Sequence, residues 1–299
     1  MGASIQGIYA AVLTPRKGTG EIDETAFRGL LRFLLGKGIG GIAVNGATGE
    51  FCLTSEREFE RLVAIVAETV AGQASFLAGI GGAGSDVSIR LGRIASKAGA
   101  AGLLLPMPFF FPYSQADLKV FSRTVAAAVE APVLLYNLPQ FTSGLDPQTS
   151  LELIQECDSI VGIKDSSGSL DTLRLLTDAG IGARRIVGSD DVLAQALDEE
   201  LLDGVVSGVA CALPELIGRL YEIGSAHSET SEVAELAATL ALFTQQLQCF
   251  PTPWGLKIIA EARGLLKATY PFPLSQSREA QKAALLRWFG EYLPQLLAQ

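Results

Sequence analysis

Lys164 is the residue whose type and position most clearly suggest catalysis. It ends the apolar run Ile160–Ile163, and it is the only one of the eight lysines that ends an apolar strand instead of standing on a helix or in a loop. A lysine at the end of a buried strand loses hydration, which disfavours its charged form and frees the amine to attack a carbonyl group. The alternative is a structural ion pair with a strand-end acid such as Asp190.

Two further groups could serve the same reaction. Tyr136 stands near the end of the preceding apolar run, Val133–Asn137, so its phenol could move a proton beside Lys164. The turn Gly46–Glu50 exposes consecutive backbone N–H groups that suit a carboxylate, and Thr48 adds a hydroxyl donor. A structural tyrosine bonded to a loop and a plain strand-to-helix turn are the alternative interpretations of these two features.

Histidine and cysteine chemistry is not expected. The single histidine, His227, lies in a polar stretch, and the four cysteines form no CxxC pair. Zinc sites need several close histidines or cysteines, and serine catalysis needs a histidine beside the serine. The chain is therefore expected to work without a metal ion. Four scattered cysteines in a chain of this length predict reduced thiols and a cytoplasmic protein.

Short apolar runs that alternate with segments of helical period must position these residues. The predicted strands are Ile8–Leu13, Gly41–Val44, Ser75–Ile80, Gly102–Leu105, Val133–Asn137, Ile160–Lys164, Arg185–Ser189 and Gly204–Ser207. The predicted helices are Asp23–Lys37, Ser55–Val70, Asp86–Ala98, Ser114–Val129, Pro147–Glu156, Leu170–Ala179, Val192–Glu199 and Pro214–Ser225. Apolar strands joined by helices predict a parallel sheet that is buried on both faces.

Eight such units predict an α/β fold, a (β/α)₈ TIM barrel over residues 1–227. The active site of such a barrel lies at the carboxyl ends of its strands, where the residues named above stand. Residues 228–299 are predicted to form a C-terminal helical extension packed on the barrel. Its apolar stripe consists of Leu236, Leu240, Phe243 and Leu247.

Composition excludes several classes of protein. Lys and Arg number 23 against 32 Asp and Glu, and this net charge of −9 repels a nucleic-acid backbone. Hydrophobic residues make up 48% of the chain, which excludes intrinsic disorder. No apolar run has the 18 or so residues that a bilayer span needs. A small molecule is the expected partner, and neither a nucleic acid nor a membrane is.

Three motifs together resemble a known family. They are GATGE at Gly46–Glu50, YNLP at Tyr136–Pro139 and GIKDSSG at Gly162–Gly168, and their order and spacing span almost the whole predicted barrel. They resemble the dihydrodipicolinate synthase / N-acetylneuraminate lyase family of pyruvate-dependent class I aldolases. The resemblance implies that Lys164 forms a Schiff base with a 2-oxo acid and that Tyr136 is the acid/base. It also implies that the turn at Ala47 and Thr48 holds the pyruvate carboxylate, that no cofactor is used, and that the chain forms a homotetramer.

Departures from the family's motifs bear on the second substrate. Dihydrodipicolinate synthases usually have a relay threonine at the position of Ala47 and a Pro-Tyr-Tyr segment at Pro108–Phe110. They also carry, near Gln140–Thr142, an arginine that holds the carboxylate of the aldehyde. All three features are absent here, which argues against lysine biosynthesis. N-acetylneuraminate lyases usually have a serine at the position of Ala47, so that activity is also disfavoured.

The expected reaction is therefore cleavage of a 2-keto-3-deoxy sugar acid, or a related 4-hydroxy-2-oxo acid, to pyruvate and an aldehyde. The KDSSG motif at Lys164 is more like the aldolases that act on such acids. Matches to positions that hold substrate in sugar-acid members give the expected binding set of Gly188, Asp190, Asp191 and Ser207. One alternative is a dihydrodipicolinate synthase that uses aspartate semialdehyde. Others are an apolar pocket built from Phe109, Phe110, Phe111 and Phe141, and a non-catalytic barrel that binds a 2-oxo acid.

Overall fold

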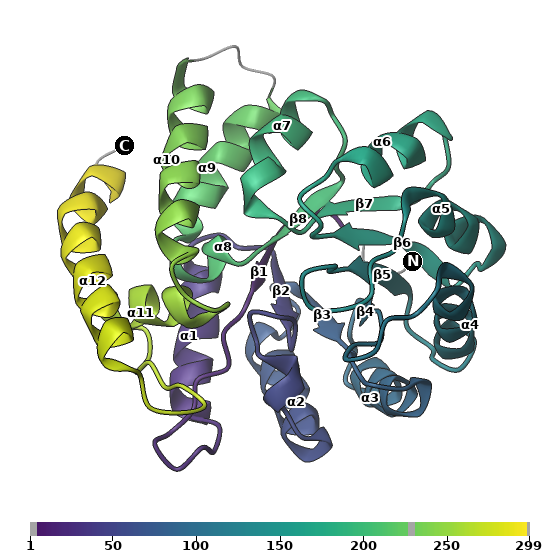
Figure 1. Cartoon of the computed structure of the whole chain (residues 1–299), viewed down its shortest axis with the longest axis horizontal. Helices are drawn as coiled ribbons and strands as arrows, with labels where there is room; N and C mark the ends of the chain where they lie inside the picture. Colours follow the sequence, from purple (N-terminus) through teal and green to yellow (C-terminus); the bar gives the residue numbers. More distant parts are fainter. Residues whose placement is uncertain (1–4, 227–230, 298–299) are drawn as a thin grey trace.

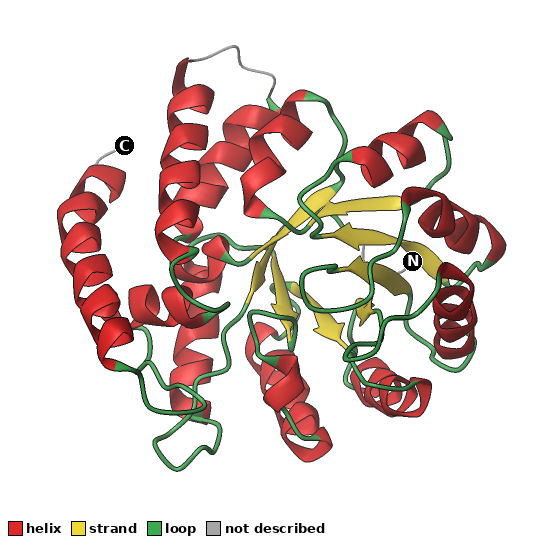
Figure 2. Ribbon diagram, in the orientation of Figure 1, coloured by secondary structure: helices red, strands yellow, loops and turns green. Residues whose placement is uncertain are grey.

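The computed structural model describes residues 5–226 and 231–297, where eight parallel strands close into a barrel (Figures 1 and 2). Each strand pairs with the next in the chain, and β8 pairs with β1. The strands are β1 (Gly7–Ala11), β2 (Gly41–Val44), β3 (Ser75–Gly79), β4 (Gly102–Pro106), β5 (Val133–Asn137), β6 (Ile160–Asp165), β7 (Arg184–Val187) and β8 (Gly204–Ser207). The predicted TIM barrel is confirmed. His227 lies outside the described residues.

Helices surround the barrel, each following the strand of its unit (Figure 2). They are α1 (Glu24–Gly36), α2 (Glu56–Val70), α3 (Ser85–Lys97), α4 (Gln115–Ala126), α5 (Pro147–Glu156), α6 (Asp171–Asp178), α7 (Leu193–Asp198), the short α8 (Val209–Ala212) and α9 (Pro214–Ser225). Two 3₁₀ turns, η1 (Phe51–Leu53) and η2 (Asp190–Val192), follow β2 and β7. Strand β7 ends two residues before the predicted Ser189, so Gly188–Asp191 lie on the loop after it.

The core has two layers. Inside the barrel, side chains such as Tyr9, Leu77, Leu134 and Tyr136 pack against one another. A larger cluster fills the space between the outer face of the strands and the helices. The alternation of side chains along each strand sends successive residues to these two layers, which explains the continuous apolar character of the strands.

Three helices follow the barrel: α10 (Ser231–Leu247), α11 (Trp254–Ala262) and α12 (Gln276–Leu297). They lie along one side of the molecule, where α10 packs on α9 and α11 packs on α8 (Figure 1). Leu236, Leu240 and Phe243 are buried as the apolar stripe predicts, while Leu247 is half-buried. The division of the chain at residue 227 stays a prediction. Among the described helices, none is long and apolar enough to cross a bilayer.

Candidate active site

Lys164 and Tyr136 lie side by side at the carboxyl end of the barrel. They are direct partners in the register of β5 and β6, and both are buried. The Lys164 Nζ lies 3.9 Å from the centroid of the Tyr136 ring. Within residues 5–226 and 231–297, Nζ has no ion-pair partner, and Asp190 is not close enough to be one. The structure therefore does not support the ion-pair alternative and leaves the amine facing an aromatic ring.

A polar brace fixes the ends of these two strands. The side-chain oxygen of Asn137 accepts a hydrogen bond from the Leu145 N–H at 3.0 Å, and its amide donates to Asp165 Oδ2 at 3.3 Å. The Ser167 N–H donates to the other oxygen of Asp165 at 2.8 Å. Asn137 and Asp165 each follow a functional residue directly in sequence, so this brace sets the orientation of Tyr136 and Lys164.

A cavity of about 360 Å³ opens above the pair. Seven of the eight residues proposed from the sequence line it: Ala47, Thr48, Tyr136, Lys164, Gly188, Asp190 and Asp191. A larger cavity of about 1110 Å³ lies at the opposite end of the barrel, beside Ile5 and Ser75, and contains none of these residues. Volume alone would select the larger cavity, but the chemistry lies in the smaller one.

Two residues of the Gly46–Glu50 turn, Ala47 and Thr48, line this cavity. The turn's own folding uses other groups: the Glu50 N–H donates to the Ala47 carbonyl at 3.0 Å, and Thr14 Oγ1 donates to the Gly49 carbonyl at 2.9 Å. In the described part of the chain, the amides of Ala47 and Thr48 have no acceptor. Such a nest is suited to an anion such as a carboxylate.

Gly188 gives the Lys164 side chain its path into the cavity. A Cβ atom at position 188 would lie 2.8 Å from Lys164 Cε and 2.1 Å from Ser166 Oγ. Both contacts are too short, so any side chain here would displace the lysine.

We expect Gly188→Ala to slow imine formation by about 10²-fold, because a displacement of about 1 Å at a reacting atom has that effect. Borohydride trapping of the imine with pyruvate in a single turnover measures this rate. Gly182→Ala is the control, since a Cβ there meets nothing within 4 Å. Equal rates for the two variants would show that Gly188 does not position the lysine.

Asp190 is an acid whose carboxyl is buried beside the cavity. Its Oδ2 accepts a hydrogen bond from the Val209 N–H at 3.1 Å, and its Oδ1 is buried without a partner among the described residues. Burial raises the pKa of Asp190 to about 6, although hydrogen bonds from Ser207 and Val209 lower it. The residue as a whole is half-buried. Asp190 therefore brings a buried carboxyl group to the wall of the cavity.

Ser207 does not line the cavity. It is fully buried, and its Oγ accepts a hydrogen bond from the Ala210 N–H at 2.9 Å. The structure places Ser207 outside the lining of this cavity, so its expected contact with the substrate stays a prediction that this geometry does not support. The register of β8 turns this side chain away from the cavity, which the sequence match did not reveal.

The raised pKa of Asp190 predicts how stability depends on pH. The folded chain keeps the Asp190 proton up to about pH 6, whereas the unfolded chain loses it near 3.8, so this group's contribution to stability is lost as pH rises between these values. Asp190→Asn removes the buried charge. We expect it to raise the free energy of unfolding by about 1–3 kcal/mol at about pH 8, and by little at about pH 4.

Urea unfolding at the two pH values checks this expectation. Asp178→Asn is the control, because Asp178 is exposed at the end of α6 and its replacement is expected to change little at either pH. A gain for Asp190→Asn that is the same at both pH values would contradict the assignment.

Several cavity residues were not found from the sequence. Some come from α10, α11 and the segment between them: Thr244, Leu247, Gln248, Phe250, Thr252 and Leu256. No motif marks them, and the apolar stripe that contains Leu247 only predicted packing. The part of the chain after the barrel therefore forms one wall of the site.

The alternative apolar pocket of four phenylalanines is not formed at Lys164. Of the four phenylalanines, only Phe141 lines the cavity. Phe110 and Phe111 line a separate cavity of about 470 Å³ together with Phe141, and Phe109 packs edge-on against Phe51. In the described ranges, no three side chains of His, Cys, Asp and Glu gather as metal ligands would.

Comparisons with known proteins agree with this geometry. The chain matches the dihydrodipicolinate synthetase family over residues 4–288. It is 30% identical over 299 residues to 4-hydroxy-tetrahydrodipicolinate synthase of Methanopyrus kandleri, with 96% of each chain covered. It is 31% identical over 279 residues to the enzyme of the same name from Salinibacter ruber, covering 92% of this chain and 91% of the relative.

The chain is also similar to a solved structure of a protein with the same name as these relatives. The structure of the 4-hydroxy-tetrahydrodipicolinate synthase of Methylacidiphilum fumariolicum superposes with a TM-score of 0.89 and is 28% identical, with 99% of both chains covered. The three motifs, the barrel and the relatives all point to one family. The chain belongs to the dihydrodipicolinate synthetase family, whose members are pyruvate-dependent class I aldolases and carbon–carbon lyases.

Proposed function

We propose that this chain joins pyruvate to an aldehyde, and splits the product in the reverse direction, through an imine at Lys164. The observation that supports this most is the unpaired Nζ of Lys164, buried 3.9 Å from the centroid of the Tyr136 ring and facing the cavity. An amine that no ion pair holds among the described residues, on a residue that lines the cavity, can reach the carbonyl carbon of a bound 2-oxo acid.

The reaction begins when Nζ attacks the C2 carbonyl of pyruvate. The carbinolamine that forms loses water, and the C–N double bond of the imine replaces the C–O bond. Loss of a proton from C3 gives an enamine, whose C3 forms the new bond to the aldehyde carbon while the aldehyde oxygen takes a proton. Water then releases the product and the free lysine. Tyr136 is proposed to carry these protons, and the N–H groups of Ala47 and Thr48 to hold the pyruvate carboxylate.

For the second substrate, the comparisons favour a dihydrodipicolinate synthase, which uses aspartate semialdehyde. Both curated relatives and the similar solved structure carry that name. This supports the synthase better than the sugar-acid aldolase that was preferred from the sequence. The non-catalytic barrel has the least support, because the family consists of lyases.

A second candidate, an uncharged hydroxyaldehyde, rests on the charges of the cavity wall. Lys164 is the only cationic side chain among the described residues that line it, and Asp190 and Asp191 add negative charge. In the region where dihydrodipicolinate synthases usually carry an arginine, the Gln140 amide donates to the Ser166 carbonyl at 3.0 Å. A carboxylate on the aldehyde would therefore have no counter-ion, whereas the acids could accept hydrogen bonds from hydroxyl groups.

One experiment separates the two candidates. Condensation of pyruvate with aspartate semialdehyde is measured beside pyruvate release from a panel of 2-keto-3-deoxy sugar acids. A higher kcat/KM for the semialdehyde supports the synthase, and a higher value for any sugar acid supports the second candidate. The remaining parts of the proposal are a homotetramer, a cytoplasmic location and no cofactor besides the imine. Neither a nucleic acid nor a membrane is proposed as a partner.

A further inference from the structure

A buried ion pair joins the segment after the barrel to the turn that is proposed to hold pyruvate. Lys257 of α11 lies with its Nζ 2.6 Å from Glu50 Oε2, and both side chains are at least nine-tenths buried. Lys257 also donates to the Thr269 carbonyl at 2.8 Å, between α11 and α12. The mechanism at Lys164 uses neither charge, so the pair needs an explanation of its own.

Glu50 occupies a strained position at the end of the turn. Its φ of 57° lies in the left-handed region, which a residue with a side chain adopts only when its surroundings fix it. Its N–H donates to the Ala47 carbonyl at 3.0 Å, so the conformation of Glu50 is coupled to the amides that face the cavity. Whatever holds the Glu50 side chain therefore holds those amides as well.

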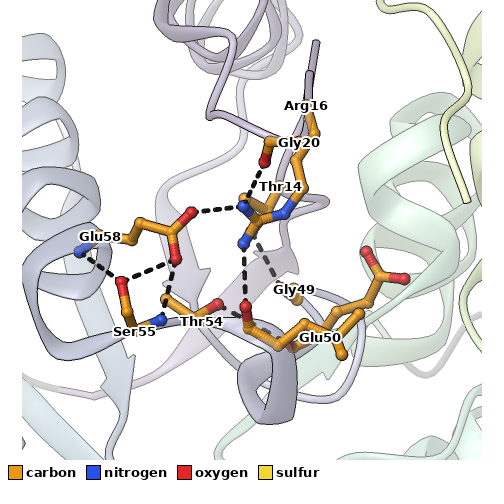
Figure 3. A network of polar contacts seen from close by, with 9 residues as sticks. Thr14, Arg16, Gly20, Gly49, Glu50, Thr54, Ser55 and Glu58 are labelled. Atoms are coloured by element: carbon orange, nitrogen blue, oxygen red, sulfur yellow. Dashed lines mark hydrogen bonds and ion pairs between the residues drawn. The ribbon is translucent and has the colours of Figure 1, made fainter. Parts of the chain in front are cut away.

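A second group of contacts, centred on Arg16, holds the backbone near Glu50 and does not involve the Glu50 carboxylate. Arg16 binds Glu58 and donates to the Leu53 carbonyl at 3.3 Å. Figure 3 shows this network on one side of the turn, with the Glu50 carboxylate directed away from it. In the described part of the chain, Lys257 is the only ion-pair partner of that carboxylate.

The turn also separates two cavities. Ala47 and Thr48 line the Lys164 cavity, while Glu50 and Lys257 line a second cavity of about 520 Å³ beside Tyr270 and Phe272. On the side of this second cavity, the ion pair to Lys257 holds the Glu50 carboxylate. Leu256, the neighbour of Lys257, lines the Lys164 cavity. The same helix, α11, therefore contacts both the cavity and Glu50.

We infer that Lys257 is a positioning residue for pyruvate binding: by holding Glu50 it fixes the turn whose N–H groups take the carboxylate. This inference rests on the proposed function of Lys164. A positioning role predicts weaker binding of pyruvate with little change in the chemical step, since the reacting groups Lys164 and Tyr136 are not touched.

The test measures borohydride trapping of pyruvate as a function of pyruvate concentration. Lys257→Met keeps the length of the side chain and removes the charge, and it leaves Glu50 buried without a counter-ion. Because that variant could fail to fold, the double variant Glu50→Gln/Lys257→Met removes both charges and relieves this penalty. Arg263→Met is the matched control: Arg263 caps α11 and pairs with Glu215 at 2.9 Å, away from the turn.

We expect the half-saturating pyruvate concentration to rise about 10-fold in the double variant, with the rate at saturation within about three-fold of wild type and Arg263→Met within about two-fold on both measures. A folded double variant with an unshifted half-saturation overturns the inference, since a merely structural pair would change the melting temperature only. An equal shift in Arg263→Met also overturns it, by assigning the effect to the docking of α11. If wild type itself traps no pyruvate, the proposed function fails first, and the inference fails with it.

Discussion

Lys164→Met should lower turnover by about 10⁴-fold or more, because the imine cannot form and every later step depends on it. Methionine keeps the unbranched stem and fills similar space beside Tyr136. Nζ has no ion-pair partner among the described residues, so its removal is expected to leave the melting temperature unchanged or raised. Steady-state kinetics and thermal unfolding on the same preparation measure both effects.

The same variant tests the ion-pair interpretation of Lys164. A structural ion pair would make Lys164→Met strongly destabilising, by about 3–5 kcal/mol, since its partner would be left buried and charged. Lys267→Met is the control, because Lys267 is exposed after α11 and is expected to keep full activity and stability. A destabilised Lys164→Met variant that retains turnover would contradict the role assigned to this residue.

Tyr136→Phe should lower turnover by about 10²–10⁴-fold, which is the usual contribution of a positioned acid/base group. The ring that lies beside Lys164 Nζ is kept, and only the hydroxyl is removed. That hydroxyl has no hydrogen-bond partner among the described residues, so the free energy of unfolding should change little. Pre-steady-state kinetics with pyruvate locate the loss in the steps that move a proton.

Tyr9→Phe provides the matched control. Tyr9 is also buried inside the barrel, but its hydroxyl bonds to Ser75 Oγ at 2.7 Å at the opposite end from Lys164. Its removal should cost about 1 kcal/mol of stability and leave turnover intact. If Tyr136→Phe keeps turnover within a few-fold of wild type, water or Thr48 carries the proton instead.

The fold and the central pair could be predicted because their signals are local. A lysine that ends an apolar strand is unusual enough to identify Lys164, and successive parallel strands place Tyr136 next to it. The predicted bounds of the strands and helices were close to the observed ones for the same reason, because the periodicity within a single segment decides them. Strand β7 ended earlier than predicted because a 3₁₀ turn begins at Asp190. The Asp190 side chain accepts a hydrogen bond from the Val209 N–H, which belongs to the next strand–helix unit of the barrel.

Features that depend on distant packing could not be predicted. Lys257 and Glu50 are far apart in sequence. Taken alone, each is an ordinary charged residue on a helix or a turn, so the sequence does not predict that they pair. Ser207 matched a substrate-binding position, yet in the register of β8 its neighbour Val206 lines the cavity and Ser207 faces away from it. Phe110 lies next to aromatic neighbours in sequence, but it has a φ of 81° and lines a separate cavity, not the one at Lys164.

The central claim is that Lys164 forms a covalent imine with pyruvate, and one measurement tests it directly. The full chain is incubated with pyruvate and borohydride, and intact-mass analysis is followed by peptide mapping. The account predicts one reduced pyruvate adduct per chain, located on Lys164 and absent from Lys164→Met. An adduct on another lysine such as Lys257, or no adduct while the protein still turns over its substrate, would contradict it.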